Sequence, residues 1–213
     1  MQKNNYPGKF IVFEGLDGSG SSTQVSLLAD YFTHYKIKFL LTKEPTNNII
    51  GGLIKGQLTK DWQTSIECLQ LLFAADRAHH LEKQIIPALK QGVHVISDRY
   101  YLSTIAFGTV GSLEEEWLYT LNQNFLEPDL IILLKVAPKV CISRMKATRF
   151  KMELFEEEKK LTQIWQAYER AAQKNNNVFL VDGEKRPEAI ISKILVQVAK
   201  IVPGLSQQIK FWA

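Results

Sequence analysis

The segment from Phe10 to Gln24 has residue types that suit phosphate binding, because an apolar run, FIVFEG, leads into glycines and hydroxyl side chains. Its three glycines let the backbone turn tightly, so that N–H groups can approach phosphate oxygens. The hydroxyl residues then open a helical pattern, whose amino end carries partial positive charge. A glycine-rich turn without a ligand is the alternative, but the order strand, GxxxxGxS/T, helix predicts a phosphate-binding loop. The loop residues are Gly15, Leu16, Asp17, Gly18, Ser19, Gly20, Ser21, Ser22 and Thr23.

One residue of this loop departs from the usual pattern. Loops of this type carry lysine where this chain has Ser21. Because phosphoryl transfer depends mainly on positioning and charge stabilisation, losing that cation should be costly unless another cation replaces it. The sequence therefore leaves two alternatives, an active enzyme with a displaced cation and a loop that binds nucleotide without catalysis.

Two charged residues follow another apolar run, in SDRYYLSTIAF. Asp98 and Arg99 come at the end of a predicted strand, where open α/β sheets bind their ligands. A carboxylate there can order metal-bound water, and a guanidinium can grip a phosphate through two parallel hydrogen bonds. We therefore expect Ser22 and Asp98 to hold Mg²⁺, directly or through water.

An aromatic ring and a guanidinium lie one helical turn apart in LLFAADRAHH. Phe73 and Arg77 are spaced i and i+4, so they share one face of a helix. Such a pair can stack on a base and hydrogen-bond its edge. The plainer interpretation, a core phenylalanine beside a surface arginine, is favoured for the pair taken alone.

The elements that must position these residues are short β-rich runs alternating with longer helical patterns. This alternation predicts an α/β fold with a parallel sheet and helices on both faces. Helical patterns are expected at 25–35, 65–92, 138–145, 161–174 and 187–202. The nearly all-apolar strand candidates are KFIVFEG, IKFLLTKEP, GVHVISDRY, DLIILLKV and NVFLVDG.

Composition is consistent with one soluble domain over residues 1–213, with 46% hydrophobic residues. The net charge of +4 is spread without a long basic block, so nucleic-acid binding is not indicated. No stretch approaches the roughly 18 apolar residues of a membrane span. Cys68 and Cys141 lack metal-ligand spacing, which favours free thiols and a cytoplasmic location.

Together these segments resemble the thymidylate kinase family, from Lys9 to the end of the last predicted helix. The first strand and loop, FIVFEGLDGSG, match the family, and LLFAADRAHHLEKQIIPALKQGVHVISDRYYLSTIAF matches its central segment almost throughout. LEPDLIILLKVAP and IWQAYERAA match its fourth strand and the helix after its lid. The resemblance implies a P-loop NTPase fold with five parallel strands. It also implies Mg²⁺-dependent phosphoryl transfer from ATP to dTMP, giving dTDP and ADP, and a possible homodimer.

The resemblance also implies residue roles. Phe73 would stack on thymine and Arg77 would hydrogen-bond it, while Arg99 would hold the acceptor phosphate. Asp17 would lie near the sugar and the metal. The remaining substrate-binding residues would be Glu44, Lys55, Ser103, Thr104, Phe107 and Tyr168, with Phe107 crowding a ribose 2′-hydroxyl and Tyr168 closing over the nucleoside. Lys55 replaces the family's phosphate-binding arginine, which keeps the charge and loses the planar fork.

A lid of approximately 144–158 would have to supply the catalytic cation, because Gly18 follows Asp17 where some members carry a basic residue. TRF matches the family's DRF, which makes Arg149 the first candidate and Arg144 the second. Lys146 and Lys151 are better explained as surface charges.

Lys135 is the candidate for replacing the lysine missing from the loop. The family usually has aspartate at this position, at the end of the strand expected to flank the loop strand. An ammonium on a flexible stem can reach a phosphate from another direction. The alternative is a lysine that extends to solvent.

The main alternatives are a kinase for another deoxynucleotide or deoxynucleoside and a nucleotide-binding protein without catalysis. The joint retention of Asp17, Arg77, Asp98 and Arg99 favours an active enzyme.

Overall fold

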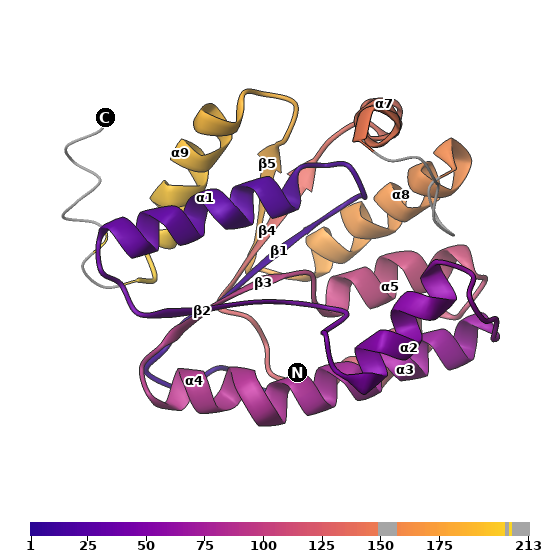
Figure 1. Cartoon of the computed structure of the whole chain (residues 1–213), viewed down its shortest axis with the longest axis horizontal. Helices are drawn as coiled ribbons and strands as arrows, with labels where there is room; N and C mark the ends of the chain where they lie inside the picture. The colour runs from indigo at the N-terminus through magenta and orange to yellow at the C-terminus, as the bar shows by residue number, and fades with distance from the viewer. Residues whose placement is uncertain (149–156, 203–204, 206–213) are drawn as a thin grey trace.

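The structure is a computed structural model and describes residues 1–148, 157–202 and 205. Arg149, Lys151 and the central part of the expected lid lie outside the described residues. In the described part of the chain, helices cover both faces of one parallel sheet (Figure 1).

Five parallel strands form the sheet in the order β2-β3-β1-β4-β5. The strands are β1 (Phe10–Gly15), β2 (Phe39–Lys43), β3 (His94–Asp98), β4 (Leu130–Lys135) and β5 (Val178–Asp182). All five strand predictions are confirmed. β1 and most of β4 are fully buried, as expected for strands with helices on both faces.

Helices α1 (Ser21–His34) and α9 (Pro187–Val198) cover one face. The other face carries α3 (Ile66–His80), α4 (Ile86–Lys90), α5 (Tyr101–Val110) and α8 (Glu158–Lys174). Figure 1 shows these two layers above and below the strands. The shorter helices are α2 (Ile49–Leu58), α6 (Glu115–Asn122) and α7 (Pro138–Thr148).

The long helix expected over residues 65–92 is interrupted by a π-helical turn, η1 (Leu81–Ile85), between α3 and α4. Pro87 has no N–H, and its ring would clash with the carbonyl four residues earlier. A wider turn before the proline relieves that clash. The last helix likewise ends at Val198 rather than at residue 202.

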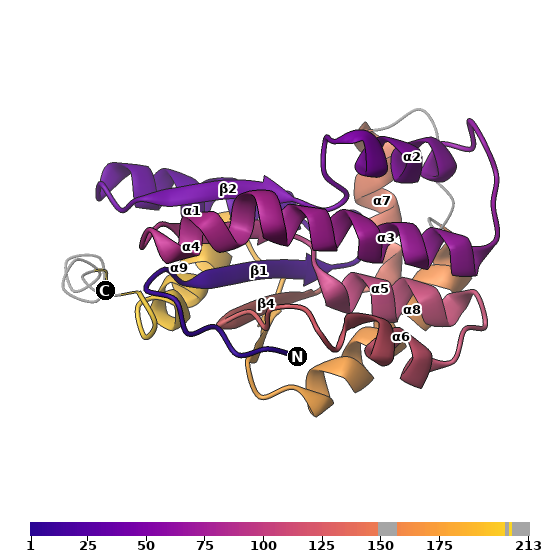
Figure 2. The same cartoon turned by 90° about the horizontal axis from the view of Figure 1, so that it is seen from below.

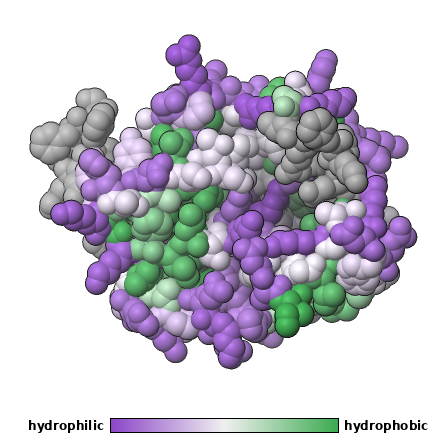
Figure 3. Space-filling model, in the orientation of Figure 1, coloured by the Kyte–Doolittle hydropathy of each residue, from purple (hydrophilic) through white to green (hydrophobic). Residues whose placement is uncertain are grey.

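The edge strand β2 is the least covered part of the sheet. Figure 3 shows an apolar area over this strand, between α1 and α4, and Leu41 is 47% exposed. Its partner strand β3 is buried over Val95 and Ile96.

The strand arrowheads in Figure 2 point to the side where α2 and α7 lie. Because β1 lies between β3 and β4, the loop after β1 is flanked by the ends of both strands. The fold therefore gathers the loop, Asp98 and the end of β2 at one edge of the sheet, where ligands of such folds bind.

Candidate functional site

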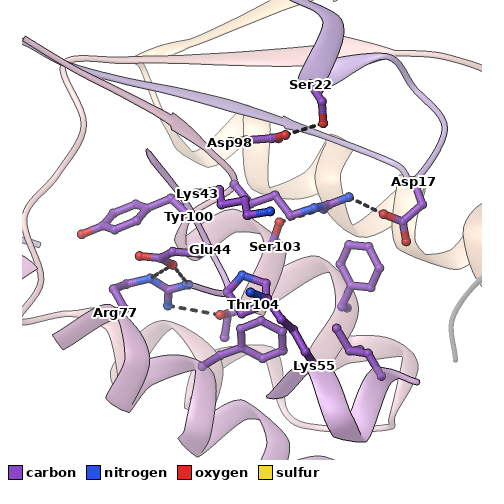
Figure 4. Close-up of a pocket in the computed structure, with 15 residues that line it drawn as sticks. Asp17, Ser22, Lys43, Glu44, Lys55, Arg77, Asp98, Tyr100, Ser103 and Thr104 are labelled. Atoms are coloured by element: carbon purple, nitrogen blue, oxygen red, sulfur yellow. Dashed lines mark hydrogen bonds and ion pairs between the residues drawn. The ribbon is translucent and has the colours of Figure 1, made fainter. Parts of the chain in front are cut away.

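Two adjoining cavities lie at the carboxyl ends of the strands. The first, which we call the nucleotide cavity, has a volume of about 300 Å³, at the lower end of the usual range for ligand pockets. Figure 4 shows its side chains converging from β2, β3, α2, α3 and α5. It is lined by Asp17, Ser22, Lys43, Glu44, Pro45, Lys55, Leu58, Phe73, Arg77, Asp98, Arg99, Tyr100, Ser103, Thr104 and Phe107.

The second, the loop cavity, has a volume of about 390 Å³. It is lined by Leu16, Asp17, Gly18, Gly20, Ser21, Ser22, Thr23, Asp98, Arg99, Arg144 and Met145. Both cavities share Asp17, Ser22, Asp98 and Arg99. Two ligands that occupied them would therefore meet at these four side chains.

The loop backbone has the conformation that its glycines predicted. Gly18 and Gly20 have φ angles of +80° and +92°, a region that other residues adopt only with strain. A Cβ on Gly18 would lie 2.6 Å from the carbonyl oxygen of Cys141, so α7 packs directly on the loop. No side chain caps the amino end of α1, which leaves its first N–H groups facing the loop cavity.

Ser21 does not bring a positive charge to the loop. Its hydroxyl donates to Asp98 Oδ1 at 3.1 Å, and Ser22 Oγ donates to Asp98 Oδ2 at 2.5 Å. Hydroxyl and carboxylate oxygens are the ligands that Mg²⁺ prefers, so Ser22 and Asp98 have suitable chemistry for the predicted metal site.

Arg99 is held in one position by several partners. Its φ angle is +73°, which is uncommon for a residue with a side chain. Nη2 lies 2.6 Å from Asp17 Oδ1, and Nη1 donates to the Gly15 carbonyl and to Ser103 Oγ. Burial lowers the pKa of Arg99, but Asp17 and the neighbouring acidic groups outweigh it and raise the pKa, so the guanidinium stays charged.

Glu14 is a buried carboxylate directly behind these residues. It accepts hydrogen bonds from the backbone N–H groups of Tyr100 and Ser103, from Ser103 Oγ at 2.6 Å and from the Tyr168 hydroxyl at 3.0 Å. Burial raises the pKa of Glu14 to about 7, against the lowering effects of Ser103 and Arg99. This carboxylate thereby ties β1 to α5 and α8.

Arg77 is not a surface charge, because it is only 1% exposed. Nε and Nη2 donate to Glu44 Oε2, and Nη1 donates to Thr104 Oγ1 and to Asn122 Oδ1. Phe73 lines the same cavity on the preceding turn of α3. The structure therefore excludes the plainer interpretation of this pair.

Glu44 is fixed from its other side by a histidine. Its Oε1 lies 3.1 Å from His80 Nδ1, and His80 Nε2 lies 2.7 Å from Thr42 Oγ1. This chain of contacts orients the carboxylate that holds Arg77.

The prediction that Lys135 reaches the loop is wrong. β4 does pair with β1, but Lys135 Nζ lies 3.7 Å from Glu169 Oε1, and the side chain is 56% exposed. Side chains alternate along a strand, and Leu133 packs in the core cluster that contains α8 rather than the one that contains α1. Lys135 shares the face of Leu133 and so points toward α8.

Tyr168 also requires correction, because it is fully buried and does not line the nucleotide cavity. Its hydroxyl contacts Glu14, Ser103 and Arg99. It therefore supports cavity residues from behind. Lys55 does line the cavity, and its Nζ donates to Asn47 Oδ1.

Arg144 is the lid candidate that lies within the described residues. On α7, its Nη1 donates to the Ser19 carbonyl at 3.0 Å and its Nη2 donates to the Gly183 carbonyl at 3.1 Å. It is the second arginine, after Arg99, among the residues that line the loop cavity.

The residues of the site that the sequence interpretation missed include Glu14, Lys43, Tyr100 and Asn122. A charged residue inside an apolar strand marks Glu14, and a cation that ends a strand marks Lys43. Tyr100 and Asn122 carry no comparable signal, since their roles depend on contacts between distant segments.

Comparisons with known proteins identify relatives of this chain. The family model "Thymidylate kinase" matches residues 13–194. A probable thymidylate kinase of Thermococcus kodakarensis is 34% identical over 91% of this chain and 98% of its own length. The thymidylate kinase of Carboxydothermus hydrogenoformans is 35% identical over 88% of this chain and 95% of its own. A solved structure of thymidylate kinase from Candida albicans superposes with a TM-score of 0.77 at 25% identity, covering 92% of this chain and 93% of the other.

Proposed function

This chain belongs to the thymidylate kinase family and transfers a phosphoryl group from ATP to dTMP, and we propose that the two cavities divide that task between them. ATP occupies the loop cavity, with its phosphates on the backbone N–H groups at the amino end of α1. The nucleotide cavity takes dTMP. The acceptor phosphate then meets the γ-phosphate at the shared residues, where in-line transfer depends on positioning and charge stabilisation.

The nucleotide cavity has suitable groups for each part of dTMP. Phe73 offers a ring face for the base, and Arg77 offers the one N–H of Nη2 that its contacts with Glu44, Thr104 and Asn122 do not use. Phe107 lies below the guanidinium of Arg99, 5.2 Å from ring centroid to Cζ, where a ribose 2′-hydroxyl would be crowded. Arg99 and Lys55 supply positive charge for the phosphate.

Mg²⁺ is the cofactor that we propose for ATP. Ser22 and Asp98 would hold it, directly or through water, because their oxygens face one another at the junction of the cavities. Bound there, the ion would supply positive charge that offsets the charge of the ATP phosphates.

Arg144 supplies the positive charge that Ser21 does not. Its side chain extends from α7 and donates a hydrogen bond to the Ser19 carbonyl of the loop. The guanidinium of Arg144 therefore lies beside the backbone that binds the phosphates in this proposal. Arg149 stays a prediction for the lid.

Residues 1–213 form a single domain in this proposal, since the described residues share one sheet. Cytoplasmic location is in keeping with the two free cysteines. Among the described helices, none is long and apolar enough to cross a bilayer. A homodimer is proposed from the family resemblance alone.

The observation that carries this function is the meeting of both cavities at Asp17, Ser22, Asp98 and Arg99. A panel of nucleoside monophosphates with Mg²⁺ATP tests it. We expect turnover with dTMP well above dUMP, and little with dCMP, dGMP or the ribose analogue of dTMP. Equal rates across the bases would overturn the assignments of Phe73 and Arg77.

A further inference from the structure

Lys43 is a cation of the nucleotide cavity without an assigned role. It ends β2 and lines the cavity beside Asp98, and Figure 4 shows its side chain reaching into the same space as Lys55. In the register of the sheet, Lys43 is the direct partner of Asp98 on β3. An ion pair between these two neighbours would be the ordinary outcome.

Asp98 instead accepts hydrogen bonds from the loop, and the described residues show no ion pair between it and Lys43. Ser21 Oγ lies 3.1 Å from one carboxylate oxygen, and Ser22 Oγ lies 2.5 Å from the other. Ser21 thus has two effects. It leaves the loop without a cation, and it hydrogen-bonds the carboxylate of Asp98, the strand partner of Lys43.

The other two carboxylates of this cavity form ion pairs with arginines. Asp17 pairs with Arg99 at 2.6 Å, and Glu44 pairs with Arg77 at 2.8 Å. Within the part of the chain that the structure describes, the side chain of Lys43 has no hydrogen bond or ion pair, although three carboxylates line its cavity. Its ammonium is left to bind an anion that enters.

The position of Lys43 identifies which anion this is. Lys43 lines the nucleotide cavity and not the loop cavity, so it faces the acceptor rather than ATP. Arg99 and Lys55 line the same cavity, so an anion that enters it meets positive charge from three side chains.

We propose that Lys43 binds the acceptor phosphate of dTMP, together with Arg99 and Lys55. Lysine acts on a phosphate as a point charge and does not need the planar fork of arginine. This inference rests on the proposed function and names a further residue of the same site. Lys43 thus adds positive charge on the acceptor side of the junction, whereas Lys135 pairs with Glu169 on α8.

The test is calorimetric titration of dTMP and of thymidine into the protein without ATP. Lys43→Met should weaken dTMP binding by on the order of 10- to 100-fold, since a hydrogen bond to a charged group contributes about that much. Binding of thymidine, which has no phosphate, should stay unchanged. Lys135→Met is the matched control and should leave both affinities unchanged, whereas Lys43→Arg should retain most of the dTMP affinity.

Two outcomes would overturn the inference. The first is a Lys43→Met protein that binds dTMP as tightly as the unaltered protein does. The second is equal weakening for dTMP and thymidine, which would place the effect on the base or sugar. If the unaltered protein binds no dTMP at all, the proposed function itself fails, and this result is distinct from either of the other two.

Discussion

At the scale of single residues, the replacement of the usual loop lysine by Ser21 means that positive charge for the phosphates must come from other elements. A serine that donates to Asp98 orders the carboxylate of the proposed Mg²⁺ site but neutralises no phosphate charge. The cations that remain come from separate elements: Arg99 after β3, Arg144 on α7, Lys43 at the end of β2 and Lys55 on α2. Each is an independent target for mutation.

Replacing Arg144 with alanine should lower kcat/KM for ATP at least about tenfold, because a charged donor near the transferring phosphate is lost. Steady-state kinetics with ATP varied at saturating dTMP measures the effect. Arg170→Ala is the control, since Arg170 makes an exposed ion pair with Glu115 and should be near neutral. Equal kinetics for the two variants would remove Arg144 from the mechanism.

Glu14 makes stability depend on pH. Its folded pKa of about 7 lies above the ordinary value of 4.5, so the folded state retains a proton that the unfolded chain has lost. The contribution of this group is fully present below its ordinary pKa and is lost as pH rises through about 7. Between these values stability should fall by up to about 1.4 kcal/mol per pH unit.

Urea unfolding at several values between pH 5 and pH 7 checks this expectation. Glu14→Gln should remove the downward slope, whatever it does to the absolute stability. Glu67→Gln serves as the control, because Glu67 is exposed and its pKa is lowered. Glu67 therefore changes the unfolding free energy only at more acidic pH, and its replacement should leave the slope between pH 5 and pH 7 unchanged. An unchanged slope in Glu14→Gln would contradict the assignment.

At the scale of elements, the loop depends on the close approach of α7. Gly18→Ala would put a Cβ 2.6 Å from the Cys141 carbonyl oxygen at a φ of +80°. Unfolding free energy should drop by at least about 1–3 kcal/mol, as expected for strain at such a position. ATP affinity should fall with it, since the loop and α7 must move apart.

Gly52→Ala is the matched control for this change. A Cβ on Gly52 in α2 meets nothing within 4 Å, and alanine is favoured over glycine in a helix by up to about 1 kcal/mol. This variant should therefore be neutral or more stable. A Gly18→Ala protein as stable as Gly52→Ala would show that the contact with α7 is unimportant.

The direction of the Lys135 side chain depends on which face of β4 it lies on. The sequence indicated correctly that its strand flanks the loop strand. Which side of that strand faces α1 depends on how α1 and α8 pack on the two faces of the sheet. Strand alternation alone does not show which face of the sheet a given side chain lies on. The prediction that β4 lies beside β1 was therefore correct, whereas the prediction that Lys135 points toward the loop was wrong.

At the scale of the whole molecule, local sequence patterns were sufficient to predict the strands of the sheet and the loop after β1. Strands such as β1 and β4 are apolar apart from Glu14 and Lys135, and the loop glycines indicate the turn that follows β1. The short helix α2 contains three glycines and gave no clear helical signal. Glu14 and Asn122 act through partners more than 40 residues away in sequence, which no local pattern reveals.

The central claim is that a loop with Ser21 still supports phosphoryl transfer. The direct measurement is chromatographic detection of products after incubation of the protein with Mg²⁺, ATP and dTMP. We expect dTDP and ADP to appear in equal amounts, and Arg99→Ala to abolish both. Binding of ATP and dTMP without formation of dTDP would contradict the account and leave a nucleotide-binding protein without catalysis.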